Sequence, residues 1–139
     1  MDILIIEDEE NARIGLAFLL ASMGHGVDQA ADAAQAIEKM KTKCYGLVIL
    51  DIMLPPGAAL RDVPFRETGK ELLLRLREEK LGKLQTPRDV PVVAVTAVSD
   101  IDVIEKINSA ADLVIYKPVY PDDAVTRMVD AGLLQRSAT

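Results

Sequence analysis

Five polar residues directly follow runs of large aliphatic residues, and their chemistry could be combined in one site. They are two neighbouring acids after the first run, an aspartate after a later one, then a threonine and a lysine: Glu7, Asp8, Asp51, Thr96 and Lys117. Carboxylates about 4 Å apart repel by roughly 4 kcal/mol per pair at an effective dielectric of about 20. One lysine does not balance three such anions, whereas a divalent cation does, and carboxylate and water oxygens suit Mg²⁺.

A magnesium ion held by carboxylates leaves room for a phosphate, so the five residues predict phosphoryl chemistry. One carboxylate attacks a phosphoryl group, while the metal and Lys117 stabilise the charge on its oxygens. The hydroxyl of Thr96 donates a hydrogen bond to a phosphoryl oxygen.

The aliphatic runs predict the strands that position these residues. They are continuous rather than alternating, which is typical of parallel strands covered on both faces. The predicted strands are residues 3–6, 27–30, 47–50, 92–95 and 113–116, and helical patterns follow at 12–23, 32–41, 69–80, 99–109 and from 121. This alternation predicts a doubly wound α/β domain with a five-stranded parallel sheet and five helices. In such sheets ligands bind beyond the carboxyl ends of the strands, where the polar residues lie.

Local signals mark the ends and inner faces of the predicted helices. Asp32 with Gln35, and Ser99 with Asp102, have the spacing of N-terminal caps, and Pro121 suits a first helical position. Two glycines end the first helix. The inward faces are predicted to comprise Ala12, Leu16, Leu19, Leu20 and Met23 in the first helix, and Leu72, Leu73 and Leu76 in the third.

Size and composition predict one cytoplasmic domain over residues 1–139. After the last strand, residues 119–139 accommodate only a helix and a tail, so no output domain is expected in this chain. The net charge of −6 disfavours direct binding to nucleic acid or to anionic membranes. The start of the chain is not a signal peptide, no apolar stretch approaches the ~18 residues that span a bilayer, and a single cysteine permits no internal disulfide.

Four motifs in order, ILIIEDEE, LVILDIMLP, VVAVTA and YKP, resemble the receiver domain of two-component response regulators. The resemblance covers nearly the whole chain and implies a flavodoxin-like sheet with strand order 2-1-3-4-5. It implies phosphorylation by a histidine kinase or a histidine phosphotransfer protein. It also implies a downstream target protein or output domain, and a possible phosphorylation-dependent homodimer. Such a domain is a regulatory switch rather than an enzyme, although it assists its own phosphorylation and dephosphorylation.

The resemblance also gives each polar residue a role. Asp51 is the phosphoacceptor, Glu7 and Asp8 are the acidic metal pair, and the backbone carbonyl of Met53 completes the Mg²⁺ shell. Thr96 is the switch hydroxyl and Lys117 the lysine that completes the pattern. The peptide bond between Lys117 and Pro118 is expected to be cis.

The chain departs from the receiver pattern at a residue linked to switching. The family usually has a tyrosine or phenylalanine three residues before the lysine, where this chain has Val114. Tyr116 is next to Lys117 in the chain, but alternation places it on the opposite strand face from Lys117. We therefore hypothesise that signalling relies less on coupling between Thr96 and an aromatic side chain.

A second departure is the long loop after the phosphoacceptor strand. Gly69 follows Pro55 by 14 positions, against about four in the family, so about ten residues are inserted in a loop over 55–68. A further long segment, EEKLGKLQTPRDVP, extends the third helix or its exit loop. Either neutral surface variation or selection of a kinase, target or dimer partner accounts for the two additions.

Other functions share parts of this pattern. A haloacid-dehalogenase-type phosphatase also uses an aspartate at a strand end, but it needs a second aspartate two residues later, where this chain has Met53. A degenerate receiver that binds partners without phosphorylation is favoured by Val114 and disfavoured by the intact acids, Thr96 and Lys117. Asp8 is also suited to capping the helix that follows it.

Overall fold

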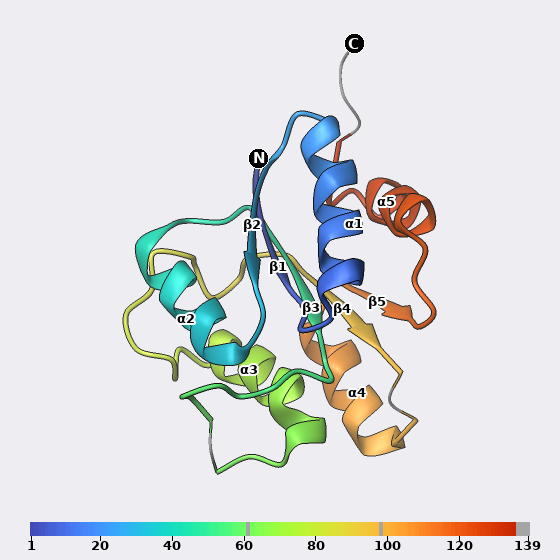
Figure 1. Cartoon of the computed structure of the whole chain (residues 1–139). Helices are drawn as coiled ribbons and strands as arrows, with labels where there is room; N and C mark the ends of the chain where they lie inside the picture. Colours follow the sequence, from blue (N-terminus) through green and yellow to red (C-terminus); the bar gives the residue numbers. More distant parts are fainter. Residues whose placement is uncertain (61, 98, 136–139) are drawn as a thin grey trace.

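Five parallel strands form a single sheet in the computed structural model, which describes residues 1–60, 62–97 and 99–135. The order is β2-β1-β3-β4-β5, as the receiver resemblance implied (Figure 1). The strands are β1 (Asp2–Ile6), β2 (Gly26–Ala30), β3 (Leu47–Asp51), β4 (Val92–Thr96) and β5 (Leu113–Tyr116). The order reverses between β1 and β3, so the carboxyl ends of these two strands lie at the switch point of the sheet.

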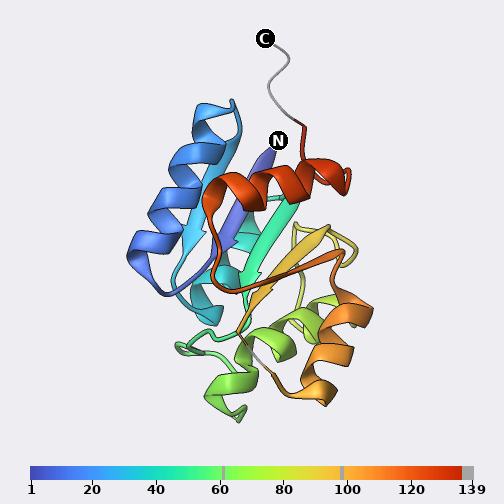
Figure 2. The same cartoon turned by 90° about the vertical axis from the view of Figure 1, so that its right-hand side faces the viewer.

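Helices cover both faces of the sheet. They are α1 (Glu10–Ser22), α2 (Ala33–Thr42), α3 (Thr68–Arg77), α4 (Ile101–Ala110) and α5 (Pro121–Asp130), with a short 3₁₀ turn η1 (Phe65–Glu67) before α3. Figure 2 looks onto α1 and α5, which pack on one face, while α2, α3 and α4 pack on the other. The predicted doubly wound α/β architecture is therefore confirmed.

The two central strands explain why the aliphatic runs are continuous. Every residue of β3 and β4 is buried, because successive side chains enter the cores on opposite faces of the sheet. Leu50 belongs to the core beneath α2, α3 and α4, and its neighbour Ile49 to the core beneath α1 and α5. Within the described residues, no helix has the length and apolarity to cross a bilayer.

Two of the predicted helix starts are confirmed. The side chain of Asp32 accepts a hydrogen bond from the Gln35 N–H at 2.8 Å, and the Gln35 side chain accepts one from the Ala31 N–H at 2.9 Å. The Asp32 cap is as the spacing predicted for α2, while the Gln35 side chain bonds the amide one residue before the N-cap rather than that of the N-cap itself. Pro121 occupies the first position of α5, where its missing N–H has no intrahelical partner to lose.

The cap predicted for α4 was wrong by one residue. Asp100, rather than Ser99, accepts hydrogen bonds from the N–H groups of Asp102 and Val103, at 2.9 and 3.4 Å. Both types of residue cap helices, but a carboxylate also interacts favourably with the positive end of the helix dipole.

Three details of α1 and α3 differ from the prediction. The predicted Ala12 is exposed, although Leu16 and Leu20 are buried as expected. Gly24, with a φ of +93°, follows the end of α1, but Gly26 belongs to β2. Helix α3 ends at Arg77 rather than near residue 80, because Glu79 adopts a left-handed φ of 58°. Its three predicted inward leucines are buried, and the long segment after it is an exit loop.

The described part of the inserted loop is folded onto the domain at both ends. At its start, the carbonyls of Pro55 and Pro56 accept hydrogen bonds from Ala33 N and Ala34 N, at 3.0 and 3.2 Å. These are the first amides of α2, which have no partner within the helix. Short turns follow, in which Val63 N donates to the carbonyl of Leu60 at 3.1 Å.

Gly69 brings the end of the insertion against the backbone at the end of β3. Its N–H donates to the carbonyl of Ile52 at 3.1 Å. A Cβ at this position would lie 2.5 Å from Ile52 Cα and 2.7 Å from the Asp51 carbonyl oxygen, closer than side chains are tolerated. Only glycine lets α3 start this close to the backbone that follows β3.

Candidate functional site

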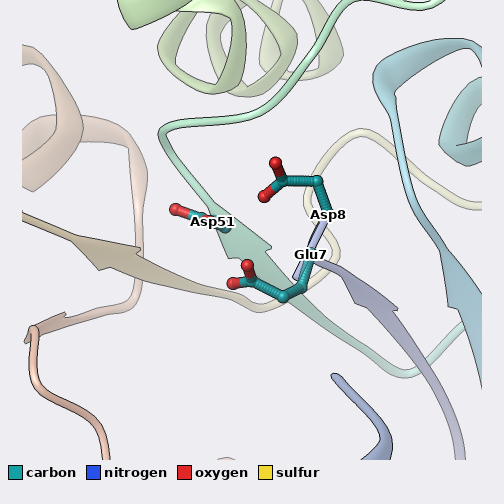
Figure 3. Close-up of side chains that lie close together, drawn as sticks. All are labelled: Glu7, Asp8 and Asp51. Carbon is teal, nitrogen blue, oxygen red and sulfur yellow. The ribbon is translucent and has the colours of Figure 1, made fainter. Parts of the chain in front are cut away.

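The three predicted acids meet beyond the carboxyl ends of β1 and β3 (Figure 3). One carboxylate oxygen of each lies within 4.8 Å of the others. Glu7 and Asp51 are only 8% and 2% exposed, whereas Asp8 is exposed. The cluster is therefore anchored in the sheet and opens to solvent on the side of Asp8.

Hydrogen bonds hold both carboxylate oxygens of Asp51. Lys117 reaches across β4 from the end of β5 and donates from Nζ to Asp51 Oδ2 at 3.1 Å. The backbone N–H of Met53 donates to Asp51 Oδ1 at 3.0 Å. The bond between Lys117 and Pro118 is cis, as expected. The sequence thus correctly predicted that the lysine would reach this aspartate.

The pKa of Glu7 is raised within this cluster of acids. Burial raises its pKa to about 8, and the hydrogen bond and negative charge of Asp51 add to the effect. The N–H of Glu9, which donates to Glu7 Oε1 at 3.1 Å, and the charge of Lys117 oppose it only in part. Without a cation, Glu7 therefore holds a proton at neutral pH and shares it with Asp51.

The pKa of Lys117 is also raised, but for a base this favours the charged form. Burial acts to lower its pKa, but the charge and hydrogen bond of Asp51 outweigh burial, with help from Glu7 and Asp8, so the pKa is raised. Lys117 is therefore a permanent cation at this site. It neutralises one carboxylate and leaves the rest of the acidic charge unbalanced.

The donor set fits a small, hard cation. The acids supply oxygen ligands from three directions, and Asp8 lies on the open side where water ligands can complete a shell. The raised pKa of Glu7 also indicates that the cluster suits a cation. A divalent cation would replace the proton on Glu7, which relieves the repulsion between Glu7 and Asp51.

Thr96 is fully buried at the end of β4, one residue beyond Val95, the partner of Asp51 in the strand register. Across the β4–β5 ladder, Thr96 pairs with Tyr116 and Ala94 with Val114. Val114 is half-buried and packs against the core beneath α4, while Tyr116 is 50% exposed. The residue paired with Ala94 is thus a valine in contact with the core, and the reduced coupling to Thr96 stays a prediction.

Sequence reasoning missed Arg13 on α1. Its Nη1 donates to the carbonyl of Glu7 at 2.8 Å, and its Nε donates to Gln29 Oε1 at 2.9 Å. Arg13 thus ties the end of β1 to the edge strand β2 and fixes the backbone that carries the acidic pair. The available signal was an arginine in the first turn of the helix that follows the acids.

The chain belongs to the response regulator receiver domain family, whose model matches residues 3–129. It is 33% identical over 129 residues to the transcriptional regulatory protein DltR of Streptococcus agalactiae, an alignment that covers 92% of this chain and 50% of DltR. It is 30% identical over 127 residues to the phosphate regulon transcriptional regulatory protein PhoB of Escherichia coli, covering 91% of this chain and 49% of PhoB. The chain therefore spans about half the length of these curated relatives.

Solved structures give the same assignment. The response regulator TrrA of Thermotoga maritima, determined in complex with Mg(2+)-BeF, superposes with a TM-score of 0.70 at 28% identity, covering 96% of this chain and 98% of TrrA. The fold is thus that of a CheY-like receiver, and the chain is a receiver domain of two-component signalling.

Proposed function

We propose that Asp51 accepts a phosphoryl group from a histidine kinase or a histidine phosphotransfer protein, and that phosphorylation switches the domain between two states. The observation that carries the proposal is the contact between Lys117 and Asp51 at 3.1 Å inside a cluster of three acids. The contact places a cation beside the acceptor oxygen, and the cluster can hold a metal ion. TrrA binds Mg(2+)-BeF on the same fold, which supports the same chemistry here.

In the proposed reaction, a carboxylate oxygen of Asp51 forms a bond to phosphorus while the bond from phosphorus to the donor histidine nitrogen breaks. The electron pair of that bond stays on the nitrogen, which takes up a proton. Lys117 lies where it can stabilise the charge on the phosphoryl oxygens, and Thr96 is the proposed hydroxyl donor to one of them.

The proposed metal ligands are Glu7, Asp8, Asp51 and the backbone carbonyl of Met53. When bound, Mg²⁺ would supply positive charge to the phosphoryl oxygens during transfer. Water later hydrolyses the aspartyl phosphate, so the domain is a switch that resets itself and not an enzyme that turns over an external substrate.

The proposed partners follow from the family and from the charge of the chain. DltR and PhoB are transcriptional regulators about twice as long as this chain, so an output domain or a separate target protein would receive the signal. A phosphorylation-dependent homodimer is one form of that output. We propose a single cytoplasmic receiver domain over residues 1–139. Its net charge of −6 disfavours direct binding to nucleic acid or to anionic membranes.

We also propose that the insertion over 55–68 helps to select the partner. Its two ends are fixed, one on α2 and the other beside Asp51, so it forms part of the surface around the phosphorylation site. Deletion of residues 57–66 is expected to change the rate of phosphorylation by the kinase or the affinity for the target. If the insertion is neutral surface variation, its deletion should change neither the phosphorylation rate nor the affinity for the target.

Incubation with acetyl phosphate and Mg²⁺, followed by intact mass measurement, tests the central proposal. We expect a hydroxylamine-labile phosphoryl adduct on the wild type, none on Asp51→Asn, and the wild-type adduct on the surface control Asp62→Asn. No adduct with any donor would favour a degenerate receiver. Repeated turnover of a phosphate ester would favour the phosphatase.

A further inference from the structure

A hollow of about 570 Å³ lies beside the candidate site, between the insertion and the start of α4. Its lining includes Met53, Arg66, Glu67, Ala97, Asp100 and Val103. Two of these residues border the site directly, since Met53 donates its N–H to Asp51 and Ala97 follows Thr96 in the chain. The hollow therefore adjoins the phosphoacceptor, and the insertion supplies one of its walls.

Arg66 is placed in this wall by the backbone. It lies in η1, three residues before Gly69, which packs against the backbone of Asp51 and Ile52. The turn is closed by a 2.9 Å hydrogen bond from Glu67 N to the carbonyl of Pro64. Three residues are less than one helical turn, so the Arg66 backbone is held near the end of β3, within reach for a long side chain.

The acids around Arg66 are engaged with other groups. Glu67 accepts a hydrogen bond from Lys70 Nζ at 2.6 Å, and the Lys70 residue is only 6% exposed. Asp100 caps the first amides of α4. Arg66 is exposed and forms no ion pair within residues 1–60, 62–97 and 99–135.

A phosphoryl group on Asp51 would supply the missing anion. It carries a charge of about −1.5 to −2 near neutral pH and presents oxygens that match the planar fork of a guanidinium. We propose that Arg66 binds the phosphoryl group on Asp51 from the hollow, covers its solvent-facing side and lengthens the life of the phosphorylated state. This inference rests on the proposed phosphorylation of Asp51.

The step that Arg66 slows is hydrolysis of the aspartyl phosphate. An oxygen of water forms a bond to phosphorus, and the bond from phosphorus to the Asp51 oxygen breaks. The electron pair returns to the Asp51 carboxylate, and inorganic phosphate leaves with the protons of the water. A guanidinium in the hollow takes the space through which that water approaches and holds the phosphoryl oxygens in an ion pair.

The test compares phosphoryl lifetimes in matched variants. Wild type, Arg66→Ala, Arg66→Lys and Arg88→Ala are phosphorylated with acetyl phosphate and Mg²⁺ and freed of donor, and loss of the adduct is followed by intact mass. Arg88 is an exposed arginine in the α3–β4 loop, so its replacement removes the same charge away from the hollow. Arg66→Ala is expected to lose the phosphoryl group about three to ten times faster than wild type, equal to about 0.7–1.4 kcal/mol.

Arg66→Lys should restore part of the lifetime, because lysine keeps the charge but not the fork. High salt should narrow the gap between wild type and Arg66→Ala, since ions screen the pairing of an exposed arginine. Arg88→Ala should match wild type, and all unphosphorylated proteins should melt at the same temperature. An Arg66→Ala lifetime equal to or longer than that of wild type would overturn the inference. Absence of any adduct on the wild type would instead overturn the proposed function and this inference with it.

Discussion

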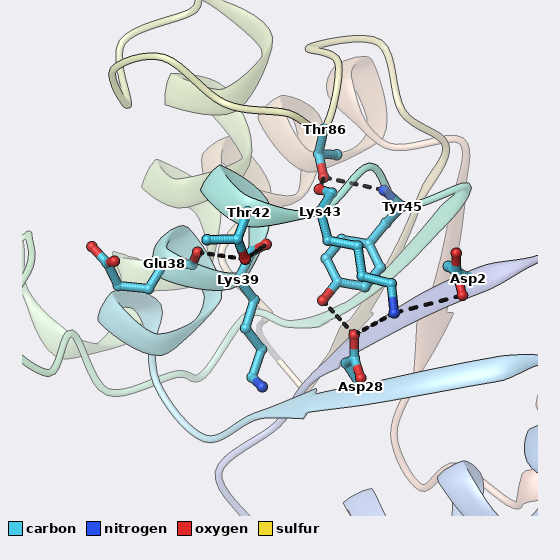
Figure 4. A network of polar contacts seen from close by, with 8 residues as sticks. All are labelled: Asp2, Asp28, Glu38, Lys39, Thr42, Lys43, Tyr45 and Thr86. Atoms are coloured by element: carbon cyan, nitrogen blue, oxygen red, sulfur yellow. Dashed lines mark hydrogen bonds and ion pairs between the residues drawn. The ribbon is translucent and has the colours of Figure 1, made fainter.

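Charged side chains cluster at both ends of the sheet, but they are paired with opposite charges at one end and left in excess at the other. At the carboxyl end, three acids lie close together (Figure 3), and the cation of Lys117 contacts one of them, Asp51. Toward the amino end of the sheet, Lys43 and Tyr45 precede β3 and contact Asp28 in the middle of the edge strand β2. Asp28 Oδ2 accepts hydrogen bonds from the Tyr45 hydroxyl at 2.7 Å and from Lys43 Nζ at 3.0 Å (Figure 4). Thr86 closes this second network by donating to the Lys43 carbonyl at 2.6 Å.

The pKa values show what this difference means. The hydrogen bond from Tyr45, and then that from Lys43, lower the pKa of Asp28, so its charge stabilises the fold. Burial and Asp51 raise the pKa of Glu7, so its charge destabilises the fold. An end that only has to hold the structure together pairs its charges, whereas an end built for phosphoryl chemistry keeps an excess of acid for a cation to neutralise.

The largest effect on stability is expected from a mutation at the carboxyl end of the sheet, and it is stabilising. Glu7→Gln should raise the free energy of unfolding of the metal-free protein at pH 8 by roughly 2–4 kcal/mol, since each pKa unit corresponds to 1.36 kcal/mol. The glutamine keeps the acceptor for the Glu9 N–H and can donate to Asp51, as the protonated acid does. Urea unfolding of both proteins with a chelator present measures the difference.

The stabilisation by Glu7→Gln depends on pH. The pKa of Glu7 rises on folding from 4.5 to about 8, so the folded state holds a proton that the unfolded state has lost. The stabilisation of the folded state by this bound proton is fully present below pH 4.5 and is lost as the pH rises to about 8. The advantage of Glu7→Gln should therefore grow across this window. A variant less stable than wild type at pH 8 would break the contrast between the two ends.

The second effect is on the affinity for Mg²⁺, which should rise with pH and level off above about 8. A cation at the acidic cluster must displace the proton on Glu7, so affinity increases by up to about tenfold for each pH unit below the pKa. Calorimetric titration in two buffers of different ionisation enthalpy should show close to one proton released at pH 7. Proton release near zero, or affinity independent of pH between 6 and 8, would contradict the protonated state of Glu7.

The smallest effects are expected at the amino end, and they are destabilising. Asp28→Asn should cost about 1–2 kcal/mol, less than a buried charged hydrogen bond, because a third of the side chain is exposed. Tyr45→Phe should cost about 0.5–1.5 kcal/mol, since Lys43 still pairs with Asp28. The pKa of Asp28 falls on folding, so its contribution is present above its unfolded pKa and is lost as the pH falls through the lowered value. Thermal melts at pH 7 measure both losses, and an increase in melting temperature for either variant would show that this network is not stabilising.

The sequence predicted what regular geometry determines. Parallel strands bring their carboxyl ends to one edge, so residues that follow strands, such as Asp51 and Lys117, could be placed together from the chain alone. The contact of Arg13 with Glu7 depends on how α1 sits on the sheet, which no local pattern encodes. The place of Arg66 depends on turns in a long loop and on the close approach of Gly69, and competing capping residues set the start of α4.

The hydrogen bonds from the first amides of α2 to Pro55 and Pro56 allow opening of the inserted loop to be followed by hydrogen exchange. Among the described residues, the carbonyl partners of the N–H groups of Ala33 and Ala34 are Pro55 and Pro56 in the inserted loop. Solvent deuterium can replace these two protons only when the loop detaches from α2 or when the domain opens more widely. Their exchange rates, compared with those of amides inside α2, therefore measure the free energy of loop opening from a helix some twenty residues earlier in the chain, without any label on the loop itself.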